Sequence, residues 1–368
     1  MVFHYLYKMV PESGKPMLRE LTGEQRRQLI DTQQVYGSWL SADAEHRRRF
    51  AGSMRWAERN GTDYLLRKIR QTENSLGPRS TETEQSFAAF TEGRERNKDL
   101  LAGLSDRLNG LARVNVAMGL GRVPVIAARI LRRCSDADLL GRQLLVVGTN
   151  ALFAYEALAG VQIASGITAT GDIDLLLDSR RRLSFVTGEK ITQSGLIGVL
   201  RKADRSFKPL KPRAFRATNR DGYLVDLIRP QTRNVLKDNA PTSISSLADD
   251  LDGAPMDGLQ WLVNAPKTEA VTIDERGYPV RIATVDPRMF ALHKAWLARR
   301  SDRSPVKAVR DREQAEAAAL IATDYLRLPF DGDYLKGFPA PLRQAAMPSI
   351  PAAQPPGFSE DSAIEPDW

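Results

Sequence analysis

Apolar and polar residues repeat at helical spacing over two stretches in the first third of the chain. Residues up to about 49 are mostly polar, and Thr22 is a suitable N-cap for a helix there. Residues 81–118 carry apolar side chains at three- and four-residue intervals, which is typical of one long helix. Between the two, Asn60-Gly61 favours a tight hairpin turn. We therefore expect residues 1–119 to form a mainly helical N-terminal region with a small hairpin.

The pattern changes after residue 120 to short apolar runs that are separated by turns. Leu144–Val147 is typical of a buried strand, followed by a turn at Gly148-Thr149 and a helix with Asn150 as its N-cap. Residues 213–228 predict a strand, a turn and a second strand, with the turn at Asn219–Gly222. These features predict an α+β domain.

The last third of the chain predicts further strands and then two helices. Strands are expected over 260–263, 268–273 and 278–285. Asp286-Pro287 and Ser304-Pro305 each combine a capping residue with proline at the first helical position. We expect the domain to span residues 120–335. The Pro- and Ala-rich residues 336–368 predict a flexible tail.

Asp172 and Asp174 alternate with aliphatic residues in the strand-like run 169–178. Residues two apart on a strand project from the same face, so these two carboxylates lie together. Asp226 stands between Val225 and Leu227 on a later predicted strand, where an isolated charge is costly. Repelling carboxylates favour a bound divalent cation, and Mg²⁺ prefers carboxylates together with phosphate oxygens. The alternative is a pair of solvated surface aspartates and a hairpin residue facing water.

The turn at Gly148-Thr149 is suited to binding an anion. Glycine permits close approach of the backbone, and the start of the following helix offers free N–H groups. The run lacks the Gly-Lys-Ser/Thr ending of a Walker loop and the glycine spacing of a dinucleotide fingerprint. An ordinary strand–helix turn is the alternative interpretation.

A Gly-Thr turn before a helix, an Asp-x-Asp strand and a lone Asp on a later strand resemble the DNA polymerase β nucleotidyltransferase superfamily. The run Val146–Gly160 is similar to an uncharacterised bacterial nucleotidyltransferase-fold family related to the abortive-infection (AbiEii-like) type. The resemblance covers residues 120–328. It implies a nucleotidyltransferase-fold mixed sheet with flanking helices. It also implies a two-metal Mg²⁺ site that transfers a nucleotidyl group from a nucleoside triphosphate, such as ATP, to an acceptor.

The resemblance also implies roles for particular residues. Gly148, Thr149 and Asn150 would hold the triphosphate, and a later helix pair would contribute Lys294 and Arg310. Asp172, Asp174 and Asp226 would be both the metal ligands and the catalytic residues. The departures are Thr149 where Ser or Gly is usual, and a longer gap between Gly148 and Asp172. For Lys294, a solvated helix face is the alternative.

Composition narrows the choice of partners. The formal charge of +8 and pI near 9.6 suit a phosphate-rich partner such as tRNA or other RNA. The hairpin is a candidate nucleic-acid-binding surface, because cations alternate there with aromatic rings at Arg55, Trp56, Arg59, Tyr64 and Arg67. A small packed sheet with a solvated edge is the alternative. No apolar run is long enough for a membrane span, and a single cysteine, Cys134, fits a packing role in a cytoplasmic protein.

Three hypotheses on function follow. The first is a magnesium-dependent nucleotidyltransferase acting on RNA, of the toxin–antitoxin or antiviral defence type; a protein side chain or small molecule remains open as acceptor. The second is a nucleic-acid-binding module that keeps the fold with little turnover. The third is a subunit whose long helix makes a homodimer or binds a defence-complex or antitoxin partner.

Overall fold

The computed structural model describes residues 17–178, 189–231, 242–330, 334, 336 and 338–346. The chain divides into two compact units. The helical unit comprises Thr22–Arg122 together with Ile273–Pro279. The sheet unit comprises Met1–Leu21, Val123–Thr272 and Val280–Trp368.

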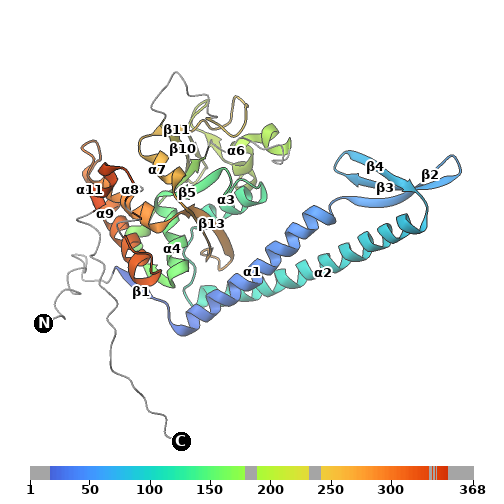
Figure 1. The fold of residues 1–368 in the computed structure, drawn as a ribbon, viewed down its shortest axis with the longest axis horizontal. Helices are drawn as coiled ribbons and strands as arrows, with labels where there is room; N and C mark the ends of the chain where they lie inside the picture. The colour runs from blue at the N-terminus through green and yellow to red at the C-terminus, as the bar shows by residue number, and fades with distance from the viewer. Residues whose placement is uncertain are drawn as a thin grey trace, which may run out of the picture. The chain divides into compact units, whose positions relative to one another are not determined.

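Two long antiparallel helices form the body of the helical unit, α1 (Gly23–Arg49) and α2 (Thr81–Ala117) (Figure 1). Thr22 caps α1 as predicted, in a capping box with Gln25. Polar groups between the helices are satisfied: the Thr32 hydroxyl and the Gln28 amide both donate to Asn115, at 3.2 and 2.9 Å. The Asn115 amide in turn donates to the Gly277 carbonyl at 2.8 Å. This network fixes the register of α1 against α2 at the level of Thr32 and Asn115.

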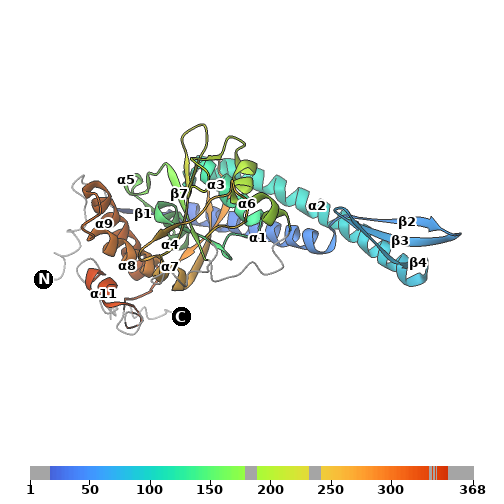
Figure 2. The same ribbon diagram turned by 90° about the horizontal axis from the view of Figure 1, so that it is seen from above.

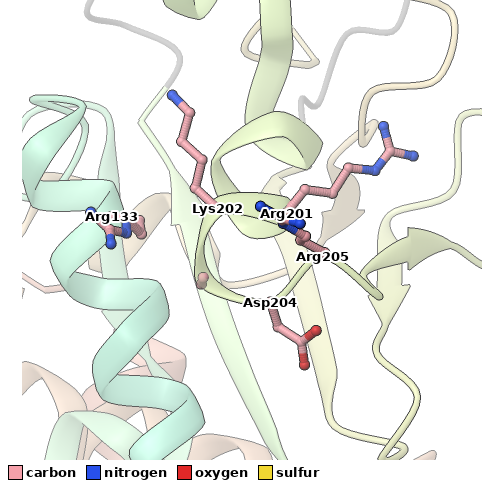
Figure 3. A pocket seen from close by; sticks show the side chains of 6 residues that line it. Arg133, Arg201, Lys202, Asp204 and Arg205 are labelled. Atoms are coloured by element: carbon pink, nitrogen blue, oxygen red, sulfur yellow. The ribbon is translucent and has the colours of Figure 1, made fainter.

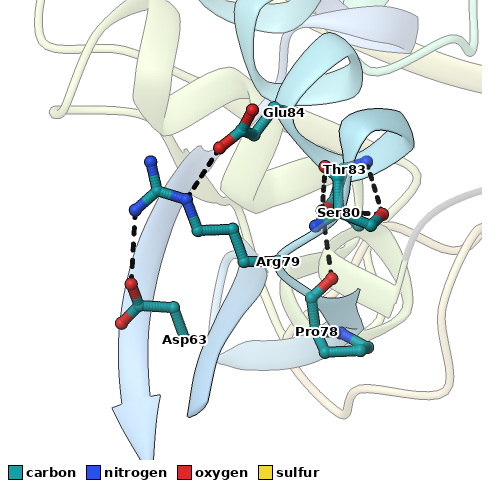
Figure 4. Close-up of polar contacts among 6 residues, drawn as sticks. All are labelled: Asp63, Pro78, Arg79, Ser80, Thr83 and Glu84. Atoms are coloured by element: carbon teal, nitrogen blue, oxygen red, sulfur yellow. Dashed lines mark hydrogen bonds and ion pairs between the residues drawn. The ribbon is translucent and has the colours of Figure 1, made fainter.

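The predicted hairpin is part of a three-stranded antiparallel sheet of β2 (Ser53–Arg59), β3 (Thr62–Ile69) and β4 (Thr72–Pro78). The third strand was missed because its mainly polar sequence has no alternating pattern. Beyond β4, Arg79 bridges Asp63 and Glu84, while Ser80 caps α2 through a reciprocal bond with Thr83 (Figure 4).

The sheet unit is built on a six-stranded mixed sheet in the order β5-β7-β10-β9-β8, with β11 also paired to β10. Its strands are β5 (Leu144–Val147), β7 (Asp172–Leu177), β8 (Lys208–Pro209), β9 (Arg216–Thr218), β10 (Leu224–Pro230) and β11 (Ala254–Met256). Two short pairings flank it: β1 (Leu18–Glu20) with β6 (Val161–Ile163), and β12 (Lys267–Ile273) with β13 (Pro279–Val285). β5 and the aliphatic positions of β7 and β10 are buried in the core.

Helices pack around this sheet. They are α3 (Val125–Asp136), α4 (Leu152–Ala159), α5 (Ser165–Thr168), α6 (Glu189–Ala203), α7 (Leu259–Asn264), α8 (Pro287–Ala298), α9 (Pro305–Leu320) and α11 (Ala340–Ala346). The helix pair α8 and α9 lies side by side (Figure 1, Figure 2). The predicted helix starts are found there: Asp286 accepts from the Arg288 N–H, and Pro305 opens α9, although the Ser304 side chain makes no capping bond. These observations confirm the expected α+β fold class with helices flanking a mixed sheet.

Three local predictions were wrong. Within the predicted flexible tail, residues 340–346 form helix α11, whose Leu342 is buried in the core. Residues 260–263, expected as a strand, lie in helix α7, because a short apolar run does not distinguish the two structures. Asn150 is not an N-cap: Gly148–Ala151 forms a short 3-10 turn before α4, and the Asn150 side chain bonds elsewhere. Among the described helices, none has the length and apolar character to cross a membrane.

Candidate functional site

The candidate aspartates come together through strand register. β7 and β10 are parallel neighbours, and Asp174 pairs directly with Asp226. Residues in register on adjacent strands, and residues two apart on one strand, project from the same face. Asp172, Asp174 and Asp226 therefore lie on one face of the sheet, at the ends where β7 and β10 begin.

Asp226 is held by an arginine that sequence reasoning missed. Arg216 lies opposite it on the antiparallel strand β9. The Arg216 Nε and Nη2 donate to the two carboxylate oxygens of Asp226, both at 2.6 Å. This bidentate pair raises the pKa of Arg216 and fixes the orientation of the buried carboxylate. The sequence places Arg216 on a strand before the turn, but the register that brings it to Asp226 is a tertiary property.

Asp174 lies in an environment that disfavours its charged form. Burial raises its pKa to about 7, with further upward contributions from Asp172 and Asp226 and an opposing one from Lys294. The Asp172 carboxylate accepts from the Thr170 hydroxyl. Burial and the two neighbouring carboxylates thus disfavour the charged form of Asp174, and a bound cation would favour it.

Gly148 brings the backbone against Asp174. Its φ of 65° lies in the left-handed region that side chains disfavour. A Cβ atom on this residue would stand 2.1 Å from the Asp174 Oδ2. Only glycine fits both the conformation and the space.

Thr149 and Asn150 connect this turn to its surroundings. The Thr149 hydroxyl accepts from Arg310 Nη2 at 3.1 Å and from Gln314 Nε2 at 3.0 Å, both on α9. The Asn150 amide donates to the Asp172 carbonyl at 2.7 Å. The candidate Arg310 thus lies at the turn, and Gln314 joins it as a contact that the sequence did not indicate.

Lys294 lies on α8 within electrostatic reach of Asp174, whose pKa it lowers. Its ammonium is nevertheless bonded to Asp311 at 2.8 Å, and Arg303 binds the other oxygen of the same carboxylate at 2.6 Å. Lys294 is buried, so the alternative of a solvated helix face is wrong for this residue.

A family model described as a nucleotidyltransferase matches residues 126–338, which is more than half of the chain. The chain belongs to this nucleotidyltransferase family. The matched region contains the aspartates and the turn described above, and membership supports nucleotidyl transfer in general. No curated protein and no solved structure shows significant similarity to the chain. Closeness to the abortive-infection type stays a prediction.

Several buried polar atoms around the candidate site lack a well-formed hydrogen bond within the described part of the chain. They are Arg310 Nε and Gln314 Oε1, together with Asn150 Oδ1 and the Tyr223 hydroxyl, whose two side chains interact with each other. Unsatisfied buried polar groups are costly, so their concentration around the turn and the aspartates is typical of a ligand site.

The carboxylates do not form a finished metal site in this conformation. Among the residues that the structure describes, no three acidic, histidine or cysteine side chains are grouped to hold an ion. Asp226 faces Arg216 instead. Cys134 is buried in the core, and burial raises the pKa of its thiol to about 12, which fits the predicted packing role.

The hairpin residues of this nucleotidyltransferase are largely engaged within the helical unit. Arg55 pairs with Glu73 at 3.0 Å, and Arg67 donates to the Arg49 carbonyl at 2.8 Å. Trp56 packs on Phe87 and beneath Arg79. Tyr64 is half-buried, while Arg59 is exposed. Of these five candidates, Arg59 is thus the exposed cation for which the structure shows no bonded partner in the described residues.

Proposed function

We propose that the chain is a magnesium-dependent nucleotidyltransferase that transfers a nucleotidyl group from a nucleoside triphosphate to an acceptor hydroxyl. The observation that carries this proposal is the register of β7 and β10, which puts Asp174 beside Asp226 and on the same face as Asp172. Gly148 closes against Asp174 from the end of β5. One buried and two partly exposed carboxylates beside a glycine turn fit the donor set and the phosphate access that the family's reaction requires.

Asp172, Asp174 and Asp226 are the proposed ligands of two magnesium ions. Bound magnesium would neutralise negative charge on the triphosphate and on the departing pyrophosphate. The donor set fits the ion in kind, because Mg²⁺ prefers carboxylate oxygens and the register of β7 and β10 brings three carboxylates to one face of the sheet.

The chain's own residues position the reactants. Gly148 admits the triphosphate, and Thr149, Asn150, Arg310 and Lys294 lie around it as donors or counter-charges. In the proposed reaction the acceptor oxygen bonds to the α-phosphorus, the bond from that phosphorus to the bridging oxygen breaks, and pyrophosphate leaves. The acceptor proton passes to Asp226, whose orientation Arg216 sets.

The proposed acceptor is RNA, such as a tRNA end, in a toxin or defence role. The net charge of +8 supports a polyanionic partner. A protein side chain or a small molecule would be the acceptor if RNA were not labelled.

A second candidate function is a nucleotide sensor or defence-complex subunit that keeps the fold with little turnover. The observation that favours it is the bidentate Arg216–Asp226 pair, which engages both oxygens of a proposed catalytic carboxylate. This pair uses one lone pair on each oxygen of Asp226, so a metal or a proton must bind through the remaining lone pairs or displace the Arg216 guanidinium.

The proposal is tested by incubating the purified protein with each α-labelled nucleoside triphosphate, Mg²⁺ and total cellular RNA or lysate. Label on an RNA band, dependent on Mg²⁺, supports the first function and names the acceptor class. Label on a protein or small molecule keeps nucleotidyl transfer but replaces RNA. Calorimetry that detects nucleotide binding without any transfer favours the second function.

A further inference from the structure

A basic hollow lies on the surface of the sheet unit, apart from the residues assigned to the reaction. It is formed where α3 meets the end of α6 and the loop that follows, and its lining includes Arg133, Arg201, Lys202, Asp204 and Arg205 (Figure 3). Four of these five side chains are cations. Arg133, Arg201, Lys202 and Arg205 are all exposed. The lining residues from the end of α6 and the following loop begin a basic segment, residues 201–220. This segment ends beside β10, the strand that carries Asp226.

The cations of the hollow are poorly neutralised. Lys202 and Arg205 have no bonded partner in the described part of the chain. Arg201 donates from Nε to the Phe207 carbonyl at 3.2 Å and lies 3.6 Å from Asp249. Arg133 pairs with Asp136 at 3.0 Å on the open surface, where such pairs contribute little. Lys202 and Arg205 are therefore fully available to a ligand of opposite charge, and Arg133 and Arg201 keep further N–H donors for it.

Asp204, the one acid of the hollow, is bonded within its own loop. Its Oδ1 accepts from the Ser206 N–H and hydroxyl at 2.9 and 2.8 Å, and its Oδ2 accepts from the Asn219 amide at 3.1 Å. These bonds lower the pKa of Asp204, so it stays ionised as a structural acceptor. Figure 3 shows Asp204 and Lys202 pointing in opposite directions.

The same bonds join the hollow to the reaction site. Asn219 belongs to the turn between β9 and β10, and the Arg220 N–H in that turn donates to Ser206 at 3.1 Å. Leu224 opens β10 directly after the turn, two residues before Asp226. The loop of the hollow is therefore fixed to the end of the sheet at which the aspartates lie.

We propose that this hollow binds the phosphodiester backbone of a single-stranded RNA and leads that strand to the aspartates. The inference rests on the proposed nucleotidyl transfer in one respect, because it takes the bound RNA to be the acceptor of the nucleotidyl group. Cations spread over a helix, a helix end and a loop suit successive phosphates better than one compact anion. The lining residues include no aromatic ring, so the hollow would bind RNA of any sequence through its backbone.

The test compares two double variants with equal loss of charge. Lys202→Gln/Arg205→Gln removes the unpartnered cations of the hollow. The competing variant, Arg59→Gln/Lys68→Gln, removes two exposed cations from the hairpin sheet of the helical unit, which is the other candidate RNA-binding surface. Binding of a fluorescein-labelled oligouridylate of roughly 20 nucleotides is followed by anisotropy without nucleotide, from about 50 to about 300 mM KCl. Thermal unfolding of each variant verifies that the fold is kept.

The hollow variant is expected to flatten the log–log salt dependence by about 1.4 and to weaken binding roughly 25-fold at about 0.1 M salt, because each lost single-strand phosphate contact contributes about 0.7 to the slope. The hairpin variant is expected to keep the wild-type slope. Sodium tripolyphosphate should compete only weakly. Four outcomes would each overturn the inference. The first two are an absence of RNA binding by the wild type and a wild-type slope in the hollow variant. Equally contrary would be a flattened slope in the hairpin variant alone, or competition by tripolyphosphate as strong as competition by RNA.

The result is separable from the proposed reaction. RNA binding is measured without nucleotide, so it can follow the expected pattern even if no nucleotidyl transfer is found, which would defeat the proposed function alone. Transfer to RNA at the wild-type rate by the hollow variant, with unchanged RNA affinity, would defeat this inference alone.

Discussion

Gly148 combines two constraints in one residue, a positive φ and contact of its backbone with the Asp174 carboxylate. In Gly148→Ala, the added Cβ strains the backbone at positive φ and also collides with the Asp174 carboxylate. Gly222 is a matched control, because its φ of 81° is also positive but a Cβ added there would have no atom within 4 Å. We expect Gly148→Ala to lower the free energy of unfolding by about 1–3 kcal/mol more than Gly222→Ala, since only the first overpacks a buried site. Urea unfolding of both variants measures the difference, and equal losses would show that Asp174 moves aside without cost.

His293 makes a pH-dependent contribution to stability. Burial, followed by the neighbouring Lys294 charge, lowers its pKa to about 3. The folded state therefore keeps the imidazole neutral, while the unfolded chain takes up a proton below about pH 6.5. Stability should fall as the pH drops from about 6.5 towards 3, by up to about 1.4 kcal/mol per pH unit.

The variant His293→Asn does not titrate in this range. The unfolding free energy of wild type minus that of this variant should therefore decrease as the pH falls through the same window. The contributions of the other titrating groups cancel in this difference. Chemical unfolding at pH 7, 6, 5 and 4 measures it. A difference that stays constant with pH would mean that the folded state protonates His293 as readily as the unfolded chain does.

The sequence predicted the three aspartates and Gly148 as neighbours because their residue types are unusual for their surroundings, and the structure places them together. An aspartate between Val225 and Leu227 needs a reason to be there, and that reason is visible without coordinates. Arg216, Gln314 and Tyr223 have no such signal. They belong to the site through strand register and helix packing, which depend on residues far apart in the sequence.

Helix α9 is joined to the turn after β5 through one hydroxyl, that of Thr149. Thr149→Val removes the acceptor and leaves the shape. We expect a loss of about 1–2 kcal/mol in stability, because Arg310 and Gln314 each lose a bond near a buried site. Nucleotide affinity should fall as well, since Arg310 would lose its bond to the turn and keep only the one to the Ala169 carbonyl.

Thr149→Ser is the control, because it keeps the hydroxyl. Thermal unfolding and calorimetry with a non-hydrolysable nucleotide compare the two variants. If valine and serine give equal affinity, the contact between α9 and the turn has no part in nucleotide binding.

Element boundaries were predictable where capping chemistry marks them. Asp286-Pro287 and Ser304-Pro305 placed the starts of α8 and α9 correctly. Prediction failed where the local pattern is ambiguous, as in α7, or uninformative, as in the polar strand β4. Packing against the rest of each unit decides those segments.

At the scale of the whole molecule, the chain has two compact units with separate cores. Units of this kind unfold independently when few contacts join them. We expect calorimetry to resolve two unfolding transitions, and Mg²⁺ with a non-hydrolysable nucleotide to raise only one of them, that of the sheet unit. A single transition that shifts as a whole would show that the units unfold cooperatively.

The central claim is that Asp174 acts in nucleotidyl transfer, and the most direct measurement is the initial rate of label transfer by Asp174→Asn. The substitution removes charge without changing volume, and Asp221→Asn is the control, because that aspartate lies exposed in the β9–β10 turn. We expect a loss of at least about 10³-fold for Asp174→Asn. Asp221→Asn should match wild type, and both variants should stay folded, with Asp174→Asn melting no lower than wild type in the absence of metal. Wild-type transfer by folded Asp174→Asn would contradict the account.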